Sequence, residues 1–331
     1  MTEVVDAHHG PLPERRLGRS PVLVTELSFG AAAIGNLFTE VSDEDAGAAV
    51  DAAWDGGIRT FDTAPHYGLG LSEHRLGAAL RRRPRDEYVV STKVGRILDP
   101  AGAPAPGEPV GLDPDGFVVP AHYVRRFDFS ADGVRRSLAA SLDRLGLDRV
   151  DIALIHDPDN HGEQALSEAY PALERLRAEG VVRAIGVGMN QAEMLTRFVT
   201  ETDIDVVLMA GRYTLLDQSA AVALLPAAER RGISVIAGGV FNSGLLAAPA
   251  PGATYDYRAA PDSLVARALR LQEICAKYGV PLRAAAARFP LTNPAVASVL
   301  IGARSPAEIT DAIRQRTLDI PGPLWDELKG E

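Results

Sequence analysis

The sequence predicts an α/β protein in which eight parallel strands close into a (β/α)8 barrel. The first observation is that eight short runs rich in β-branched residues recur along the chain. The second is that Ala-, Leu-, Arg- and Glu-rich stretches with helical spacing separate these runs. Strands that alternate with helices imply a parallel sheet, and eight such units close a barrel of ~250 or more residues. The expected strands are 24–30, 58–64, 87–94, 150–157, 182–188, 204–210, 233–239 and 296–302.

Helices are expected between these strands because apolar residues return at helical intervals. In "SADGVRRSLAASLDRLG" the apolar face consists of Val134, Leu138, Leu142 and Leu145. Serine precedes several of these stretches, and a serine hydroxyl can accept a hydrogen bond from the first exposed amides of a helix. The expected caps are Ser42, Ser130 and Ser305.

Composition favours one soluble globular domain over residues 1–331. Hydrophobic residues make up 46% of the chain, the formal net charge is −10, and the basic residues are scattered. We therefore expect no nucleic-acid or membrane partner. The single cysteine, Cys275, allows no disulfide framework, and no metal site is expected. The polar N-terminus does not resemble a signal peptide, so a cytoplasmic location is expected; the sequence does not indicate the oligomeric state.

An open dinucleotide-binding sheet is the main alternative fold. The segment "GLGLSE" (68–73) begins like a G-x-G-x-x-G fingerprint. However, it follows the second predicted strand instead of the first, and Glu73 occupies the position of the third glycine. The barrel is therefore favoured, and it requires functional residues at the carboxyl ends of the strands.

Four residues with acid–base chemistry occur at these positions. Asp62 ends the second predicted strand, Tyr67 follows in the next loop, Lys93 ends the third strand and His156 ends the fourth. Each also has an ordinary structural explanation. Asp62 could be a turn residue and Tyr67 an aromatic residue packed in a loop. Lys93 could be a solvent-directed lysine at a strand end, and His156 could be a core histidine. Their shared rim favours a catalytic cluster.

The chemistry of such a cluster can be stated from its residue types. A free tyrosine has a pKa near ~10, and a neighbouring ammonium group lowers it. An aspartate can hold that lysine in place, and a histidine can hydrogen-bond the same substrate oxygen. The set would exchange a proton with a carbonyl or hydroxyl oxygen, which suits hydride transfer with a nicotinamide cofactor.

The chain resembles the aldo-keto reductase superfamily over nearly its whole length, from "RRLGRSPVLVTELSFGAAAIG" to "SVLIGARSPAEI". The most specific segments are "DTAPHYGLGLSE", "STK" and "LIHDPD". The resemblance implies a (β/α)8 barrel with Asp62, Tyr67, Lys93 and His156 as a catalytic tetrad. The segments "AGRYTLLDQ" and "GGVFNSGLL" resemble a subgroup of L-fucose (D-threo-aldose) dehydrogenases and pyridoxal 4-dehydrogenases. The implied activity is NAD(P)-dependent oxidation of a sugar, with pyridoxal oxidation or general carbonyl reduction as alternatives.

The resemblance also implies a set of cofactor-binding residues: Gly30, Ala31, Asp62, Asn190, Phe241, Asn242, Ser243, Leu245, Gly302, Arg304 and Glu308. Three positions depart from the usual pattern, namely Met189, Ala210 and Gly238. Glu308 stands where NADP-dependent relatives place an arginine, so NAD is favoured, with NADP as the alternative. Residues 305–308 also read as a capping box at a helix start.

The substrate is expected to meet long loops over the carboxyl end of the barrel. Residues 95–129 follow the third strand without obvious structure and are predicted to form a substrate lid. The candidate substrate contacts are His66, His122, Tyr123 and Arg126, with Arg125 and Asp128 beside them and Tyr255 and Tyr257 on the loop 248–262. Polar loops of this kind suit a sugar or another small polar carbonyl compound.

Two other classes remain open from the residues. Lys93 would form a Schiff base in a barrel aldolase, and a non-enzymatic nucleotide-binding subunit would keep the cofactor site without turnover. The aldolase interpretation gives no joint role to Tyr67, Asn190 and the loop 238–245. The sequence shows no recognisable partner surface for a nucleotide-binding subunit.

Overall fold

The protein is described by a computed structural model that places residues 11–102 and 109–331. Eight parallel strands form a closed barrel in the order β10-β11-β14-β3-β4-β5-β8-β9. The closed sheet confirms the predicted fold class and removes the open-sheet alternative. The barrel strands are β3 (Leu27–Gly30), β4 (Thr60–Asp62), β5 (Val89–Val94), β8 (Ile152–His156), β9 (Ala184–Met189), β10 (Val206–Ala210), β11 (Ser234–Gly238) and β14 (Val296–Gly302).

The strand predictions are accurate to a residue or two. Seven observed strands lie inside the predicted runs, and β9 continues one residue further, to Met189. The first predicted run, 24–30, joins the end of a separate strand, β2 (Leu23–Thr25), to β3. Periodicity could not separate these two because both contain apolar, buried residues.

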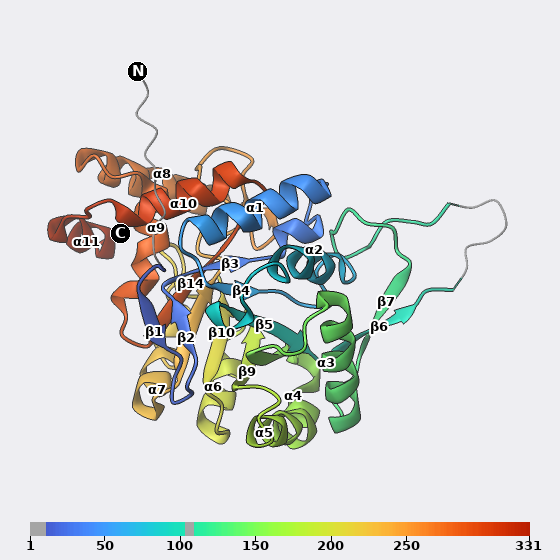
Figure 1. Ribbon diagram of the computed structural model, residues 1–331. Helices are drawn as coiled ribbons and strands as arrows, with labels where there is room; N and C mark the ends of the chain where they lie inside the picture. The colour runs from blue at the N-terminus through green and yellow to red at the C-terminus, as the bar shows by residue number, and fades with distance from the viewer. Residues whose placement is uncertain (1–10, 103–108) are drawn as a thin grey trace.

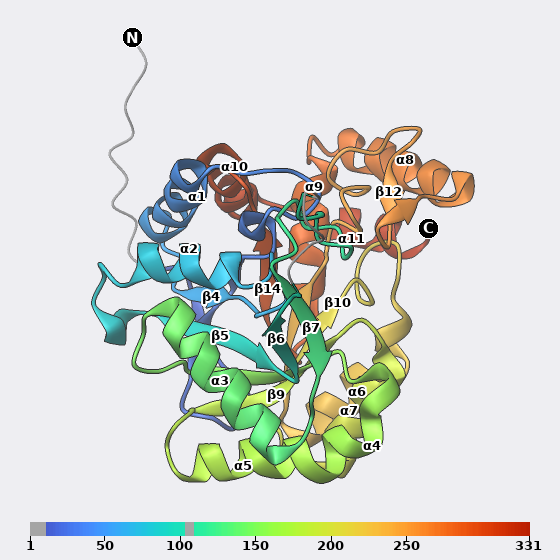
Figure 2. The same ribbon diagram turned by 90° about the vertical axis from the view of Figure 1, so that its right-hand side faces the viewer.

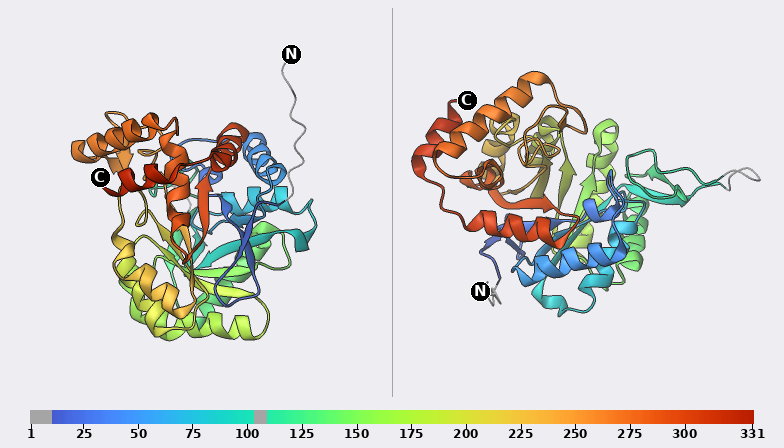
Figure 3. Two further views of the ribbon diagram at one scale, coloured as in Figure 1. Left: turned by 90° about the vertical axis from the view of Figure 1, so that its left-hand side faces the viewer. Right: turned by 90° about the horizontal axis from the view of Figure 1, so that it is seen from above.

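Helices surround the strands on the outside of the barrel (Figures 1 and 3). The helices are α1 (Asp43–Asp55), α2 (Leu71–Leu80), α3 (Ala131–Leu145), α4 (Gly162–Gln164), α5 (Tyr170–Ala178), α6 (Ala192–Glu201), α7 (Leu224–Arg231), α8 (Asp262–Lys277), α9 (Leu282–Arg288), α10 (Pro306–Thr317) and α11 (Gly322–Lys329). The three serine caps are confirmed, since Ser42, Ser130 and Ser305 each accept a hydrogen bond from the backbone amide three residues later.

A short hairpin of β1 (Glu14–Arg16) and β2 (Leu23–Thr25) contributes to the interior of the barrel. Leu17, Val22 and Val24 are fully buried and pack in one cluster with barrel residues such as Ile152 and Val206. The amino-terminal end of the barrel is therefore filled with side chains, and ligands must approach from the carboxyl end.

The lid segment 95–129 has more structure than its sequence indicates. It contains an antiparallel hairpin of β6 (Arg96–Pro100) and β7 (Tyr123–Phe127), which projects beside α3 (Figures 1 and 2). Its described inner part, 109–122, returns to the barrel, where Phe117 and Val119 are buried against Leu69. Six residues of the predicted lid, 103–108, lie outside the described residues. A second small hairpin pairs β12 (Thr254–Tyr255) with β13 (Arg258–Ala259) in the loop after β11.

Within 11–102 and 109–331, no helix is long and apolar enough to cross a membrane.

Candidate active site

The four predicted catalytic residues converge at the carboxyl end of the barrel. Lys93 Nζ lies 2.6 Å from Asp62 Oδ2 and donates to the Thr63 carbonyl at 2.9 Å. The same ammonium group lies 4.7 Å from the centre of the Tyr67 ring. The rings of Tyr67 and His156 lie edge to face with their centres 5.9 Å apart. Neighbouring parallel strands β4, β5 and β8 bring these residues to one place.

The turn after Tyr67 fixes the position of the phenol. Gly68 has φ +62°, and a Cβ at this residue would lie 2.3 Å from the Gly35 carbonyl oxygen. Only glycine allows this left-handed backbone to pack so closely against the loop after β3. Glu73, the residue that breaks the dinucleotide fingerprint, is fully buried and accepts hydrogen bonds from Thr92 and Arg144. The glycines 68 and 70 thus shape the turn after Tyr67, and neither lines either of the two cavities described below.

The charge state of the tetrad differs in one respect from the sequence-based expectation. Desolvation by burial raises the pKa of Tyr67 to about 12, and the lowering effect of the Lys93 ammonium group only partly offsets it. The pKa of Lys93 itself is raised because the attraction of Asp62 and Tyr67 exceeds its desolvation. A lysine held charged in this way is a poor Schiff-base nucleophile, which argues against the aldolase.

Two histidines of the site, the tetrad residue His156 and the neighbouring His66, are held in their neutral form. Burial, helped by nearby cationic groups, lowers the pKa of His66 to about 2 and that of His156 well below its usual value. His156 Nε2 lies 3.5 Å from the carboxylate of Asp157, which also pairs with Arg96 of β6. His156 Nδ1 is buried and has no hydrogen-bond partner among the described residues. A neutral imidazole here can orient a substrate oxygen without competing for its proton.

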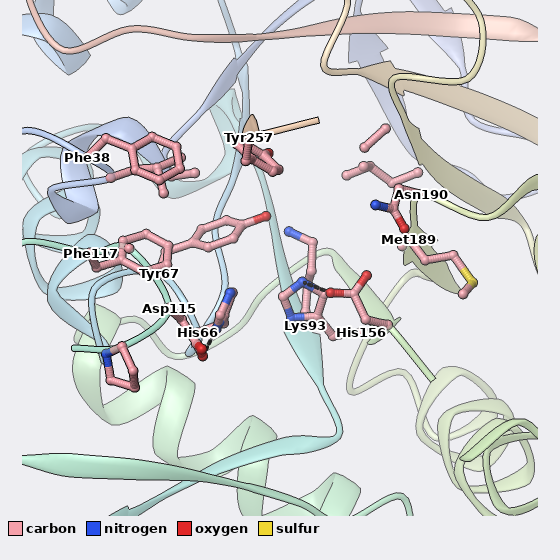
Figure 4. A pocket seen from close by; sticks show the side chains of 18 residues that line it. Phe38, His66, Tyr67, Lys93, Asp115, Phe117, His156, Met189, Asn190 and Tyr257 are labelled. Atoms are coloured by element: carbon pink, nitrogen blue, oxygen red, sulfur yellow. Dashed lines mark ion pairs between the residues drawn. The ribbon is translucent and has the colours of Figure 1, made fainter. Parts of the chain in front are cut away.

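A cavity of about 500 Å³ opens in front of these residues (Figure 4). Its polar wall contains Lys93, Asp115, His156, Asp157 and Asn190, while its apolar walls contain Phe38, Phe117, Met189, Leu208 and Tyr257. The rings of Phe38 and Tyr257 are 5.6 Å apart and come from the loops after β3 and β11. The cavity therefore offers hydrogen-bonding groups on one side and flat hydrophobic surface on the other.

A second cavity of about 500 Å³ adjoins the first and runs toward the start of α10. Tyr67 and Tyr257 line both cavities. Glycines floor the second one: a Cβ on Gly238, Gly244 or Gly302 would meet no atom closer than 3.6 Å. Exposed backbone in an elongated groove fits a dinucleotide, whose phosphates approach main-chain amides closely.

The structure places most of the predicted cofactor residues along these two cavities. Those that line them are Gly30, Asp62, Asn190, Phe241, Ser243, Gly302, Arg304 and Glu308. Ala31, Asn242 and Leu245 are buried behind the cavity walls and do not line them. The Ala31 amide instead donates to the Asp62 carbonyl, and the Asn242 amide closes a turn onto Gly239.

Glu308 takes part in a capping box as expected, but its carboxylate binds a different backbone amide from the usual one. Ser305 Oγ accepts from the Glu308 amide at 3.3 Å, and Glu308 Oε2 accepts from the Arg304 amide at 2.7 Å. The carboxylate thus reaches one residue before the cap, and it lines the groove beside Arg304. Arg283, Asp311 and Gln315 complete this end of the groove; no motif marked them in the sequence.

The predicted substrate contacts separate into two groups. His66 lines the first cavity, whereas His122, Tyr123 and Arg126 do not. These three are exposed residues of β7 or of the position just before it, and Arg126 pairs with Asp99 of β6. The lid reaches the cavity through residues 114–117 instead. Sequence reasoning missed Asp115 and Phe117 because nothing in "DPDGF" shows which side chains turn inward.

The (β/α)8 barrel, the tetrad and the two adjoining cavities are together typical of an oxidoreductase. The family model of the Aldo/keto reductase family matches residues 26–323, and the chain belongs to this family.

Proteins of known activity resemble this chain over almost all of its length. A D-threo-aldose 1-dehydrogenase of a Pseudomonas species is 50% identical over 309 residues, covering 92% of this chain and 93% of that protein. A pyridoxal 4-dehydrogenase of Microbacterium luteolum is 42% identical over 332 residues, covering 96% and 97%. Among solved structures, an aldo-keto reductase of Bacillus halodurans in its holo form superimposes with a TM-score of 0.75 at 24% identity, covering 96% of each chain. That last likeness concerns the fold alone.

Proposed function

We propose that this protein is an aldose 1-dehydrogenase that prefers NAD and oxidises the C1 hydroxyl of a sugar to a lactone. The observation that carries the proposal is the position of Tyr67. It lines both the groove that fits a dinucleotide and the cavity that would hold a small polar substrate. A proton-transfer group is needed where these two ligands meet. The 50% identity to a D-threo-aldose 1-dehydrogenase supports a sugar as the substrate.

In the proposed reaction, Tyr67 acts as the base for the C1 hydroxyl of the sugar. Its raised pKa disfavours the phenolate, and the Lys93 ammonium group opposes this effect by favouring the anion. Asp62 keeps Lys93 charged and in place through the 2.6 Å contact. His156 would hold the same substrate oxygen from the opposite side. A nicotinamide cofactor, held along the second cavity by residues such as Ser243 and Gly302, would supply the acceptor for the hydride of C1.

NAD is favoured over NADP because of Glu308. Its carboxylate lines the groove next to Arg304, where the 2′ position of the adenosine ribose would lie. A fixed negative charge repels a 2′-phosphate and can accept a hydrogen bond from a 2′-hydroxyl. The opposing charge of Arg304 weakens this preference, so we expect a bias and not an absolute requirement.

Pyridoxal oxidation is a second candidate, since Phe38, Phe117 and Tyr257 give the cavity aromatic surface against which a flat ring can pack. The 42% identity to a pyridoxal 4-dehydrogenase supports it.

Absorbance at 340 nm tests the proposal with the purified protein, NAD or NADP, a panel of aldoses, and pyridoxal. Reduction of NAD with L-fucose or related sugars at a higher kcat/KM than with pyridoxal is expected. Turnover of pyridoxal alone would replace the first candidate by the second. Cofactor binding without turnover of any substrate would support a nucleotide-binding subunit.

A further inference from the structure

The lid carries a carboxylate into the substrate cavity. Asp115 lines the cavity, and its side chain keeps 47% of its surface exposed. It belongs to the segment 114–117, and it is the one carboxylate among those four residues. Figure 4 shows Asp115 beside His66, on the opposite side of the Tyr67 ring from Phe38 and Tyr257.

Arg125 of β7 fixes this segment to the catalytic loop. Its guanidinium group donates to both carboxylate oxygens of Asp113 at 2.6 Å and to the carbonyl of His66 at 2.8 Å. The Arg125 and Asp113 side chains are only 8% and 0% exposed. A bidentate pair of this kind is rigid because the planar fork matches the carboxylate. The position of Asp115 two residues later is thereby determined.

Asp115 shares its arginine partner with Asp113. Its Oδ2 lies 3.0 Å from Arg125 Nη1, but Asp113 already neutralises that guanidinium group. Two carboxylates therefore share one cation. A carboxylate in excess charge, open to a cavity, is a strong acceptor for ligand hydroxyl groups.

His66 adds a second acceptor to the same wall. Its Nδ1 faces the Asp115 carboxylate at 4.0 Å and is buried with no hydrogen-bond partner among the described residues. A neutral imidazole that keeps its proton on the nitrogen facing a carboxylate has a free lone pair on the other nitrogen. Figure 4 shows that other nitrogen directed toward the cavity.

We propose that Asp115, positioned by Arg125, selects the substrate by accepting hydrogen bonds from sugar hydroxyl groups distant from the reacting carbon. The inference rests on the proposed function and names the residue that makes the site specific for a polyhydroxylated, uncharged substrate. Hydroxyl donors satisfy Asp115 and His66. A ligand without them displaces water from the carboxylate and offers no donor in its place, and an anionic ligand is repelled.

The test combines substitutions at Asp115 with changes in the sugar. We would measure kcat/KM for the best aldose and for analogues in which each hydroxyl other than that at C1 is removed in turn. The proteins are the wild type, Asp115→Ala, Asp115→Asn and the control Asp99→Asn. Asp99 is matched to Asp115, since it also pairs with an arginine of β7 at similar exposure, and it does not line the cavity.

For at least one hydroxyl, the wild type should lose tenfold or more in kcat/KM on its removal. With the parent sugar, kcat/KM of Asp115→Ala should be lower than that of the wild type by a similar factor, mostly because KM is higher. Removing that same hydroxyl from the sugar should then lower kcat/KM of Asp115→Ala little further. Uronic acids extend the test to charge. Asp115→Asn should improve their kcat/KM relative to the neutral aldose at least threefold, a shift that a purely structural role of Asp115 would not cause.

The outcomes separate the two proposals. A wild type that oxidises no aldose overturns the proposed function, and the assignment of Asp115 with it. In a second outcome, the wild type oxidises aldoses, but the Asp115 variants still lose kcat/KM when the hydroxyl is removed and still reject uronic acids. This outcome overturns the assignment of Asp115 and leaves the proposed function standing. The Asp99→Asn control should behave as wild type in every comparison.

Discussion

Replacing Lys93 by methionine should destabilise the protein as well as inactivate it. Lys93 and Asp62 are only 2% and 3% exposed, and their charged atoms are 2.6 Å apart. Methionine keeps most of the side-chain volume, so the main loss is the charge. Asp62 would then keep only the Ser91 hydroxyl as a side-chain donor and no cation beside it, and the Thr63 carbonyl would lose its donor. Removing one partner of a buried ion pair costs about 3–5 kcal/mol of unfolding free energy.

Part of the lost unfolding free energy should return when the Asp62 carboxyl group, which has lost its lysine partner, is also removed. In the double variant Asp62→Asn/Lys93→Met, the unfolding free energy should rise by about 1–3 kcal/mol above that of Lys93→Met. Activity should stay absent, because the group that favours the Tyr67 phenolate is missing. The contrast would distinguish a charge effect from a packing effect.

Urea unfolding followed by circular dichroism measures these free energies, and absorbance at 340 nm measures the activity. Lys329→Met is a suitable control, since Lys329 and Asp326 are 3.8 Å apart with side chains 65% and 82% exposed. Exposed substitutions of this kind usually change stability by less than about 0.5 kcal/mol. If Lys93→Met unfolds like the control, or if the double variant is as unstable as the single one, the charge argument is wrong.

Three further outcomes are expected. Tyr67→Phe should reduce kcat by about 10²–10⁴-fold, while cofactor affinity measured by fluorescence quenching stays within a factor of two; turnover within tenfold of wild type would contradict the proton-transfer role. Glu308→Arg should raise the kcat/KM ratio of NADP to NAD at least tenfold, about 1.4 kcal/mol, and a wild type that already prefers NADP by that margin would mean that Arg304 dominates. His66 has a folded pKa of about 2 against an ordinary value of 6.5, so the unfolded chain binds the extra proton between these values and stability falls as pH drops below about 6.5. His66→Gln should reduce the loss of unfolding free energy between pH 7.5 and pH 5.5, measured by urea unfolding, by about 1.4 kcal/mol in total, and an unchanged loss would show that His66 protonates freely in the folded protein.

Local patterns in the sequence predicted the architecture because they act over short distances. Strand periodicity, serine caps and the spacing of apolar residues depend on neighbours a few positions away. Once eight strand–helix units are recognised, parallel pairing places all carboxyl ends on one rim. For this reason Asp62, Lys93 and His156 could be expected together although they lie far apart in the chain.

Sequence patterns carried less information about the lid and about charge. The pattern of 95–129 contains no periodic signal, and which of its polar side chains turn inward depends on the pairing of Arg125 with Asp113. His122, Tyr123 and Arg126 looked equally suitable, yet they are exposed and do not line the cavity. The net pKa of Tyr67 is likewise a balance between burial and a neighbouring charge, and residue identities supply only the second.

The sequence by itself thus determined the barrel, the family and the four side chains at its rim, since each depends on local pattern and strand order. Only the tertiary structure decided that two cavities meet at Tyr67, that the rings of Phe38 and Tyr257 come into contact in the wall of the first cavity, and that Asp115 lines that cavity. These features arise where loops of unrelated sequence come into contact. Such contacts depend on long-range packing and the sharing of charges, which no pattern along a single loop encodes.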